Sequence, residues 1–215
     1  MTTDELKRDG LGTTRLVRGA GGPFVERDTR TARVPIRWLA RRLAAREAAA
    51  LAALAGEARV PRLLAFDGQV VRRSYVAGSP LYESPPRSRA YFVDALRALR
   101  RVHRAGVAHN DLAKEANWLV VGSGDACGIV DFQLATLSRR RSARFRRRAY
   151  DDLRHLLKHK RTYQPERLTA RQRRMLAQPT LMALFWRTLV KPPYHFVTRV
   201  VLAWPERVGP AERRS

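Results

Sequence analysis

Two carboxylates and an amide lie close together in the middle of the chain. Asp111 belongs to the loop sequence HNDL, Asn117 follows it by six residues, and Asp131 ends the apolar run GIVDF. A carboxylate placed like Asp111 can accept the proton of a hydroxyl group. An amide oxygen and a second carboxylate are hard ligands that suit Mg²⁺ on a nucleotide, with Mn²⁺ as the alternative metal. These residue types fit metal-assisted transfer of a phosphoryl group from a nucleotide to a hydroxyl acceptor.

The composition favours an intracellular globular protein. The chain has 215 residues, 45% of them hydrophobic, which is enough for one sizeable core or for two small lobes that share a cleft. Cys127 is the only cysteine, so an internal disulfide is excluded and a reducing compartment is favoured. The polar N-terminal sequence has no signal-peptide core, and no apolar run approaches the ~20 residues of a membrane-spanning helix. We therefore expect a cytoplasmic location.

The net charge of +24 comes almost entirely from arginine, since only five of the 43 basic residues are lysines. One interpretation is a polyanionic partner, which would be a nucleotide, an anionic membrane surface or, with less support, a nucleic acid. The other is an Arg-rich composition that decorates solvated helix faces, and charge alone does not separate the two. The densest basic segment, SRRRSARFRRR at 138–148, follows shortly after Asp131.

The first third of the chain predicts a small antiparallel sheet with one long helix. Short apolar patches separated by glycine clusters or by the Asp67-Gly68 turn indicate strands at 13–18, at 23–28, within 60–68 and at 70–76. A helical pattern runs from Pro35 to Leu54 and is closed by Gly56. The breaker at 77–80 is the expected hinge to a second lobe.

The rest of the chain predicts a mainly helical lobe. Helical periodicity covers 87–105, 149–160, 169–177 and 180–204, the last broken at two prolines, with two short strands at 117–121 and 128–132. The fold class is therefore α+β, with a sheet lobe over 1–77 and a helical lobe over 78–215.

This order of elements, together with the HNDL, Asn117 and DFQ motifs, resembles the small atypical kinases, namely the RIO-type protein kinases and the bacterial lipopolysaccharide-core (Kdo/heptose) kinases. The resemblance covers roughly residues 8–160 and is strongest at 95–135. It implies a minimal bilobal protein-kinase-like fold that uses ATP and Mg²⁺. It also implies that Asp111 is the catalytic base, that Asn117 is a catalytic residue and metal ligand, and that Asp131 is the second metal ligand.

The chain departs from the protein-kinase pattern at several positions. Asn110 replaces the arginine that meets a phosphorylated activation loop in regulated kinases, and Gln133 replaces the glycine after the metal-binding Asp. Asn117 comes one residue later than the motif places it, so either the loop carries an extra residue or its register shifts. No lysine lies between Lys7 and Lys114, so the strand lysine of kinases is missing. These departures imply an atypical, unregulated kinase.

An arginine is expected to replace the missing lysine. Glu47 lies on the long predicted helix and suits the helix glutamate that pairs with a strand cation, although an exposed Glu paired with a nearby Arg fits the pattern nearly as well. Arg27 is the favoured partner, because arginine can hold phosphate oxygens through two hydrogen bonds. Arg72 and Arg73 are weaker candidates.

The remaining nucleotide contacts are expected from backbone groups. Gly10 and Gly12 offer part of a glycine-rich loop whose N–H groups would approach phosphates, although a plain turn would have the same residues. The resemblance implies that Tyr75, Val76 and Ala77 bind adenine. It also implies that Asp152 braces the catalytic loop.

The acceptor hydroxyl is expected on a protein Ser/Thr or on a lipopolysaccharide core sugar. The segment after Asp131 is short and lacks an Ala-Pro-Glu motif, unlike the segments on which peptides dock. The tail aromatics Trp186, Phe196 and Trp204 suit peripheral contact with an anionic inner membrane, or else they pack the helical lobe. A small-molecule kinase similar to the aminoglycoside or choline kinases remains an alternative. Another is a catalytically impaired kinase-fold module that binds nucleic acid or anionic membrane.

Overall fold

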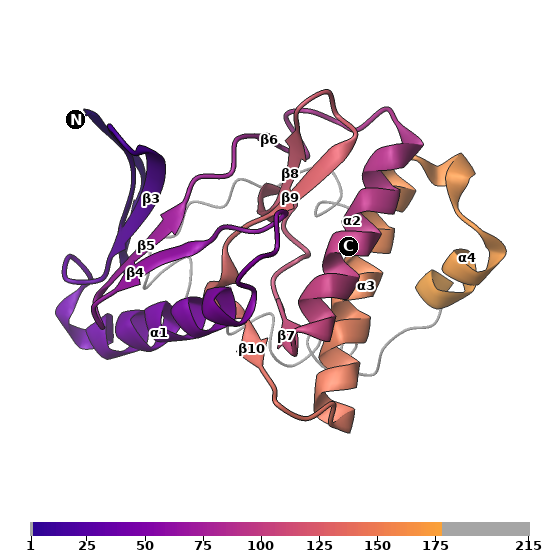
Figure 1. The fold of residues 1–215 in the computed structure, drawn as a ribbon. Helices are drawn as coiled ribbons and strands as arrows, with labels where there is room; N and C mark the ends of the chain where they lie inside the picture. The colour runs from indigo at the N-terminus through magenta and orange to yellow at the C-terminus, as the bar shows by residue number, and fades with distance from the viewer. Residues whose placement is uncertain (1, 178–215) are drawn as a thin grey trace.

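The computed structural model of the chain describes residues 2–177 and is an α+β structure (Figure 1). A five-stranded antiparallel sheet has the order β1-β2-β3-β5-β4. Its strands are β1 (Thr2–Asp9), β2 (Gly12–Gly19), β3 (Gly22–Asp28), β4 (Leu63–Phe66) and β5 (Val70–Ser74). With α1 (Arg37–Ala53), these strands form the sheet lobe. The four predicted strands and the predicted helix are confirmed.

Strand β1 is the element of this lobe that the sequence did not predict. Its residues are almost all exposed, and it lies at the sheet edge, paired with β2 from Thr2↔Arg18 to Asp9↔Gly12. An edge strand that buries no side chains needs no apolar alternation. The signal used to find the other strands was therefore absent.

Helix α1 follows a short 3-10 turn, Val34–Ile36, and has no side-chain N-cap hydrogen bond. It buries a face of small apolar residues together with Glu47. The N-terminal half packs into a small core with Leu11, and the C-terminal half joins the main core through Ala50, Leu51 and Leu54. One helix thus belongs to the cores of both lobes.

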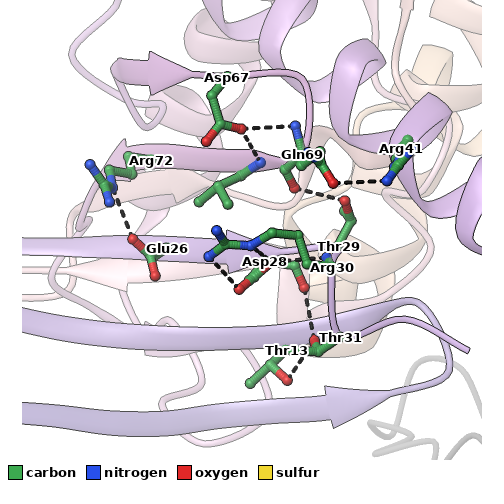
Figure 2. Close-up of polar contacts among 11 residues, drawn as sticks. Thr13, Glu26, Asp28, Thr29, Arg30, Thr31, Arg41, Asp67, Gln69 and Arg72 are labelled. Atoms are coloured by element: carbon green, nitrogen blue, oxygen red, sulfur yellow. Dashed lines mark hydrogen bonds and ion pairs between the residues drawn. The ribbon is translucent and has the colours of Figure 1, made fainter.

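A polar network ties the end of β3 to the β4–β5 turn and to α1 (Figure 2). Arg30 donates to both carboxylate oxygens of Asp28, each at 2.9 Å. Thr29 Oγ1 donates to the carbonyl of Gln69 at 2.7 Å, and Arg41 of α1 donates to the side-chain oxygen of Gln69 at 2.8 Å. These bonds fix α1 relative to the strand that precedes it.

The helical lobe follows the connection at 75–78. Its helices are α2 (Arg89–Arg104), α3 (Ala143–Tyr163) and α4 (Ala170–Ala177), and α2 and α3 lie side by side (Figure 1). The short strands are β6 (Ser79–Pro80), β7 (Val107–Ala108), β8 (Trp118–Val121), β9 (Ala126–Ile129) and β10 (Thr136–Leu137). The main core gathers Tyr91, Leu99, Leu112, Trp118, Ile129, Phe132 and Leu156.

The predicted helices of this lobe are found where the structure describes them, with one shifted boundary. Helix α3 begins at Ala143 rather than at 149, because Ser142 caps it by accepting a hydrogen bond from Phe145 N at 3.2 Å. Part of the basic segment 138–148 is therefore the first turns of a helix. The expected helix 180–204 and its aromatics lie outside the described residues. Within 2–177, no helix is long and apolar enough to cross a membrane.

Candidate functional site

His109 connects the two motifs that the sequence singled out. Its side chain is fully buried after β7, and the ring lies 4.6 Å from that of Phe132. Nε2 donates to the carbonyl of Val130 at 3.0 Å, and Nδ1 accepts from the backbone N–H of Asp111 at 3.3 Å. These two bonds assign the proton to Nε2. The ring thus holds the loop of Asp111 against the strand end that carries Asp131.

Asp152 of α3 braces the same loop from the other side, as predicted. One carboxylate oxygen accepts from the backbone N–H of His109 at 2.8 Å and faces Nε2 of His103 at 3.1 Å. The other accepts from the backbone N–H of Asn110 at 2.9 Å. Because Asp152 is buried, these bonds compensate the loss of hydration of its charge.

Asn110 has a structural role in the loop of Asp111. Its backbone is left-handed, with φ 66°, a conformation that Asn tolerates better than most residues. Its side-chain amide lies 2.8 Å from the carbonyl of Leu134 and 2.7 Å from Thr136 Oγ1. Asn110 therefore ties the loop of Asp111 to β10.

Asn117 still reaches Asp111 despite the extra residue between them. Its Nδ2 donates to the backbone carbonyl of Asp111 at 2.8 Å and to the carboxylate at 3.2 Å. The segment between them contains a 3-10 turn, Glu115–Asn117, whose buried Glu115 accepts from Tyr163 at 2.7 Å. Within residues 2–177, Asn117 Oδ1 accepts no hydrogen bond from a neighbour, so it is the oxygen suited to a metal.

Asp131 follows the end of β9 by two residues and has a left-handed conformation, with φ 67° and ψ 65°. Gln133 donates to its carboxylate at 3.3 Å. Burial favours the neutral acid, but the charges of Arg27, Arg73 and Lys114 outweigh it and lower the pKa of Asp131. The carboxylate is therefore ionised at neutral pH and can bind a cation.

Two arginines flank Glu47 rather than one. Glu47 is fully buried, which excludes the exposed alternative, and it accepts from Arg27 at 3.3 Å and from Arg73 through its other oxygen. Burial lowers the pKa of Arg73 to about 10, against the opposing effect of Asp131. The sequence favoured Arg27 alone, and the structure brings Arg27 and Arg73 to the same carboxylate.

Arg72 lies on the other face of the sheet. It pairs with Glu26 at 2.8 Å, and its side chain is half exposed. Neighbouring strand residues point to opposite faces, so only one of the two adjacent arginines on β5 can reach Glu47. The sequence interpretation gave Arg72 and Arg73 as equal candidates, with no reason to prefer Arg73.

Lys114 is a site residue that the sequence interpretation did not single out. Its Nζ lies 2.9 Å from the carboxylate of Asp111. Burial raises the pKa of Asp111, Lys114 opposes this rise, and the nearby charge of Asp131 adds to it. The signal was available, because Lys114 follows Asp111 by three residues in the same loop.

A pocket of about 210 Å³ lies where the two lobes meet around these groups. Asn117, Asp131 and Gln133 line it from the helical lobe, and Arg27 and Arg73 line it from the sheet lobe. Its remaining lining residues are Lys7, Asp9, Gly12, Thr14, Ala116 and Val130. The pocket therefore contains the cationic side chains of Lys7, Arg27 and Arg73 together with the carboxylates of Asp9 and Asp131.

Only one of the two predicted loop glycines lines this pocket. Gly12 does so, at φ 125°, and an added Cβ there would lie 2.3 Å from the carbonyl oxygen of Asp28. Gly10 forms the β1–β2 turn with Leu11, and its carbonyl accepts from Arg33 N at 3.1 Å. The glycine sequence is thus a tight hairpin turn, anchored to the segment before α1.

The predicted adenine segment lies apart from the pocket lining. Tyr75, Val76 and Ala77 are not among the residues that line it, and the backbone N–H of Tyr75 donates to Pro23 at 3.4 Å. Val76 packs closely on Gly128 of β9, where an added Cβ would lie 2.9 Å from it. The segment therefore joins the lobes by packing on the β8–β9 hairpin.

Within residues 2–177, no group of three or more His, Cys, Asp or Glu side chains is placed to hold a metal ion. A metal at Asp131 and Asn117 would take its other oxygen ligands from phosphate and water, which is how Mg²⁺ is commonly bound.

Comparison with protein-family models and with curated proteins finds no match.

Proposed function

We propose that the chain is an ATP-dependent phosphotransferase with a minimal bilobal protein-kinase-like fold. One observation carries this proposal. Asn117 and Asp131 line the same pocket as Arg27 and Arg73, and Asp111 is hydrogen-bonded to Asn117 at the edge of that pocket. Metal-binding oxygens, phosphate-binding cations and a base thus converge at the junction of a sheet lobe and a helical lobe.

In this proposal the two arginines hold the phosphates of ATP from the sheet lobe. Their guanidinium groups present forked donors that match phosphate oxygens, and Glu47 keeps both in place. A Mg²⁺ ion held by Asp131 and Asn117 would neutralise charge on the phosphates during transfer. The free Oδ1 of Asn117 and the ionised Asp131 are the protein oxygens that fit this ion.

Asp111 is the proposed base. It orients the acceptor hydroxyl and takes its proton as the acceptor oxygen bonds to the γ-phosphorus and the bond to the β-phosphate oxygen breaks, releasing ADP. Its raised pKa suits a carboxyl group that must hold this proton. Lys114, 2.9 Å from Asp111, places a positive charge beside the group in transfer.

The proposed acceptor hydroxyl belongs to a protein Ser/Thr or to a lipopolysaccharide core sugar. Ten residues lie between Asp131 and Ser142, the cap of α3, and they include the 3-10 turn Phe132–Leu134 and the two-residue strand β10, so the chain offers no long peptide-docking segment at this position. This supports an acceptor that presents a compact group. We place the reaction in the cytoplasm, with contact at the inner membrane if the acceptor is a glycolipid.

ADP release and phosphate incorporation by the full chain, given ATP, Mg²⁺ and each class of acceptor, test the proposal. Asp111→Asn and Asp131→Asn should each lower turnover by about 10²–10⁴-fold. The matched control is Asp125→Asn, an exposed Asp in the β8–β9 turn, which should leave turnover unchanged. Turnover that survives both site substitutions would overturn the assignment. Salt-sensitive binding of polyanions without any turnover would instead support a kinase-fold binding module.

A further inference from the structure

A second pocket, of about 270 Å³, lies beside the loop of Asp111 and contains three arginines. Arg46 comes from α1, and Arg144 and Arg148 come from the first turns of α3. Its other lining residues are Thr136, Leu137, Ser138, Ser142 and Phe145, so no carboxylate lines it. We call these three side chains the arginine triad.

Folding alone does not account for the triad. Arg144 and Arg148 are four residues apart on one helix, a spacing at which like charges repel. In the part of the chain that the structure describes, no ion pair or side-chain hydrogen bond links any of the three to an acidic group. Burial and the charges of Arg144 and Arg46 together lower the pKa of Arg148. An anion bound among the three side chains would remove this repulsion.

The hydroxyl groups beside the triad specify the kind of anion. Thr136, Ser138 and Ser142 add donors to a pocket already rich in guanidinium groups. Forked guanidinium donors with nearby hydroxyls match the several oxygens and the double charge of a phosphate monoester. A carboxylate would use fewer of these donors.

The position of the triad indicates which phosphate it holds. Thr136 Oγ1 lies 2.7 Å from the side-chain amide of Asn110, which directly precedes Asp111, and β10 pairs with β7. The pocket with Asp131 is lined by an entirely different set of residues. A phosphate in the triad therefore lies beside the loop that carries the base without occupying the proposed nucleotide pocket.

We propose that the arginine triad binds a phosphate monoester on the acceptor, so that the enzyme acts on a molecule that is already phosphorylated. The binding site itself stands on the triad, and its assignment to the acceptor rests on the proposed phosphotransferase function. The carrier of the phosphate is a sugar phosphate or a phosphoserine, which present the same group.

Calorimetric titration of inorganic phosphate into the full chain, with ADP and Mg²⁺ saturating and ionic strength constant, tests the site without requiring turnover. Arg144→Gln and Arg148→Gln should each weaken binding by about tenfold or more, because each removes a charge-assisted hydrogen bond. Arg147→Gln is the matched control, since Arg147 is exposed on the same helix and does not line the pocket. Equal weakening in all three variants, or no binding of phosphate, would overturn the site.

A kinetic comparison tests the assignment to the acceptor. A hexose phosphate and a phosphoserine peptide are compared with their unphosphorylated forms, and the phosphorylated form should have the lower KM. Arg148→Gln should remove that difference, while Arg147→Gln should keep it. Phosphate binding that responds to Arg148→Gln without any preference between acceptors would overturn the acceptor assignment and leave the anion site standing. The carrier with the larger preference identifies the source of the phosphate.

Discussion

Two groups of arginines lie on different sides of one turn of α1, and they are the pair around Glu47 and the arginine triad. Arg27 and Arg73 surround the buried carboxylate of Glu47, whereas Arg46, the residue before Glu47, belongs to the triad that lacks any acidic lining residue. Consecutive helix residues point about 100° apart, so one turn can serve both places. The same residue type is thus neutralised on one side and left without a counter-charge on the other.

The difference separates what folding requires from what binding requires. A buried arginine loses hydration and must be compensated by a carboxylate within the protein. A partly exposed arginine keeps its hydration, so it can remain without a partner at a small cost in stability. Substitution of Arg27 or Arg73, the cleft arginines, should therefore affect stability as well as the proposed phosphate binding, whereas substitution in the triad should affect ligand binding alone.

Glu47→Gln should have the largest effect on stability. It leaves Arg27 and Arg73 buried beside a neutral amide, and removal of one partner from a buried ion pair costs about 3–5 kcal/mol of unfolding free energy. Urea unfolding monitored by circular dichroism gives this free energy. Glu26→Gln is the control, because its partner Arg72 is half exposed and such pairs contribute about 0–1 kcal/mol. Equal losses in the two variants would contradict the division between the two arginine groups.

The next effect concerns Asp131 and is a dependence on pH. Its pKa is lowered in the folded state, so ionised Asp131 stabilises the fold fully above its unfolded pKa of about 3.9, and this stabilisation is lost as pH falls through the lowered value. Asp131→Asn should therefore reduce the unfolding free energy by about 1–2 kcal/mol at pH 7 and show a shallower loss below pH 4. Denaturant titrations at several pH values measure both. If the unfolding free energies of the unsubstituted protein and of Asp131→Asn change in parallel with pH, Arg27, Arg73 and Lys114 do not stabilise this carboxylate.

The elements that bury apolar faces could be predicted from the sequence. Strands β2, β3 and β5 each contain a short apolar patch, and α2 repeats its apolar residues at helical spacing, so each was found close to its true bounds. Strand β1 could not be found in this way, because backbone pairing alone holds it at the sheet edge. The start of α3 at Ala143 was also missed, since it depends on the Ser142 cap within a run of arginines.

The site residues were predictable where a motif names them, but their contacts were not. Asp111, Asn117, Asp131 and Glu47 occupy the region that the motifs indicated. Arg73 beside Glu47 depends on which face of β5 it occupies, and the 3-10 turn before Asn117 depends on the burial of Glu115. Such outcomes come from packing between elements that are distant in the sequence, so no local pattern encodes them.

Asp111→Asn should stabilise the fold while removing activity. Burial raises the pKa of Asp111 in the folded state, so the ionised carboxylate destabilises the fold. This destabilisation is complete when the pH is above the pKa of the folded state, and it is absent when the pH is below the pKa of the unfolded state. The neutral amide should raise the unfolding free energy at pH 7 by up to about 1 kcal/mol, with the lost Lys114 pair offsetting part of the gain. Chemical unfolding and the turnover assay on one preparation measure both. If the variant is instead less stable, Asp111 is a group that the fold requires, as Glu47 is.

The smallest effect is expected at the triad, where Arg148→Gln should slightly stabilise the protein. It removes the repulsion from Arg144, a like-charge spacing that destabilises helices by about 0.2–0.5 kcal/mol. Thermal unfolding at low ionic strength should show the gain, and about 1 M salt should abolish it, since the Debye length falls to about 3 Å. Added phosphate should make the unsubstituted protein more stable than Arg148→Gln, because phosphate stabilises only the protein that retains the triad. A loss of stability in phosphate-free, low-salt buffer would show that Arg148 has a counter-charge within the fold, and the contrast with the cleft arginines would fail.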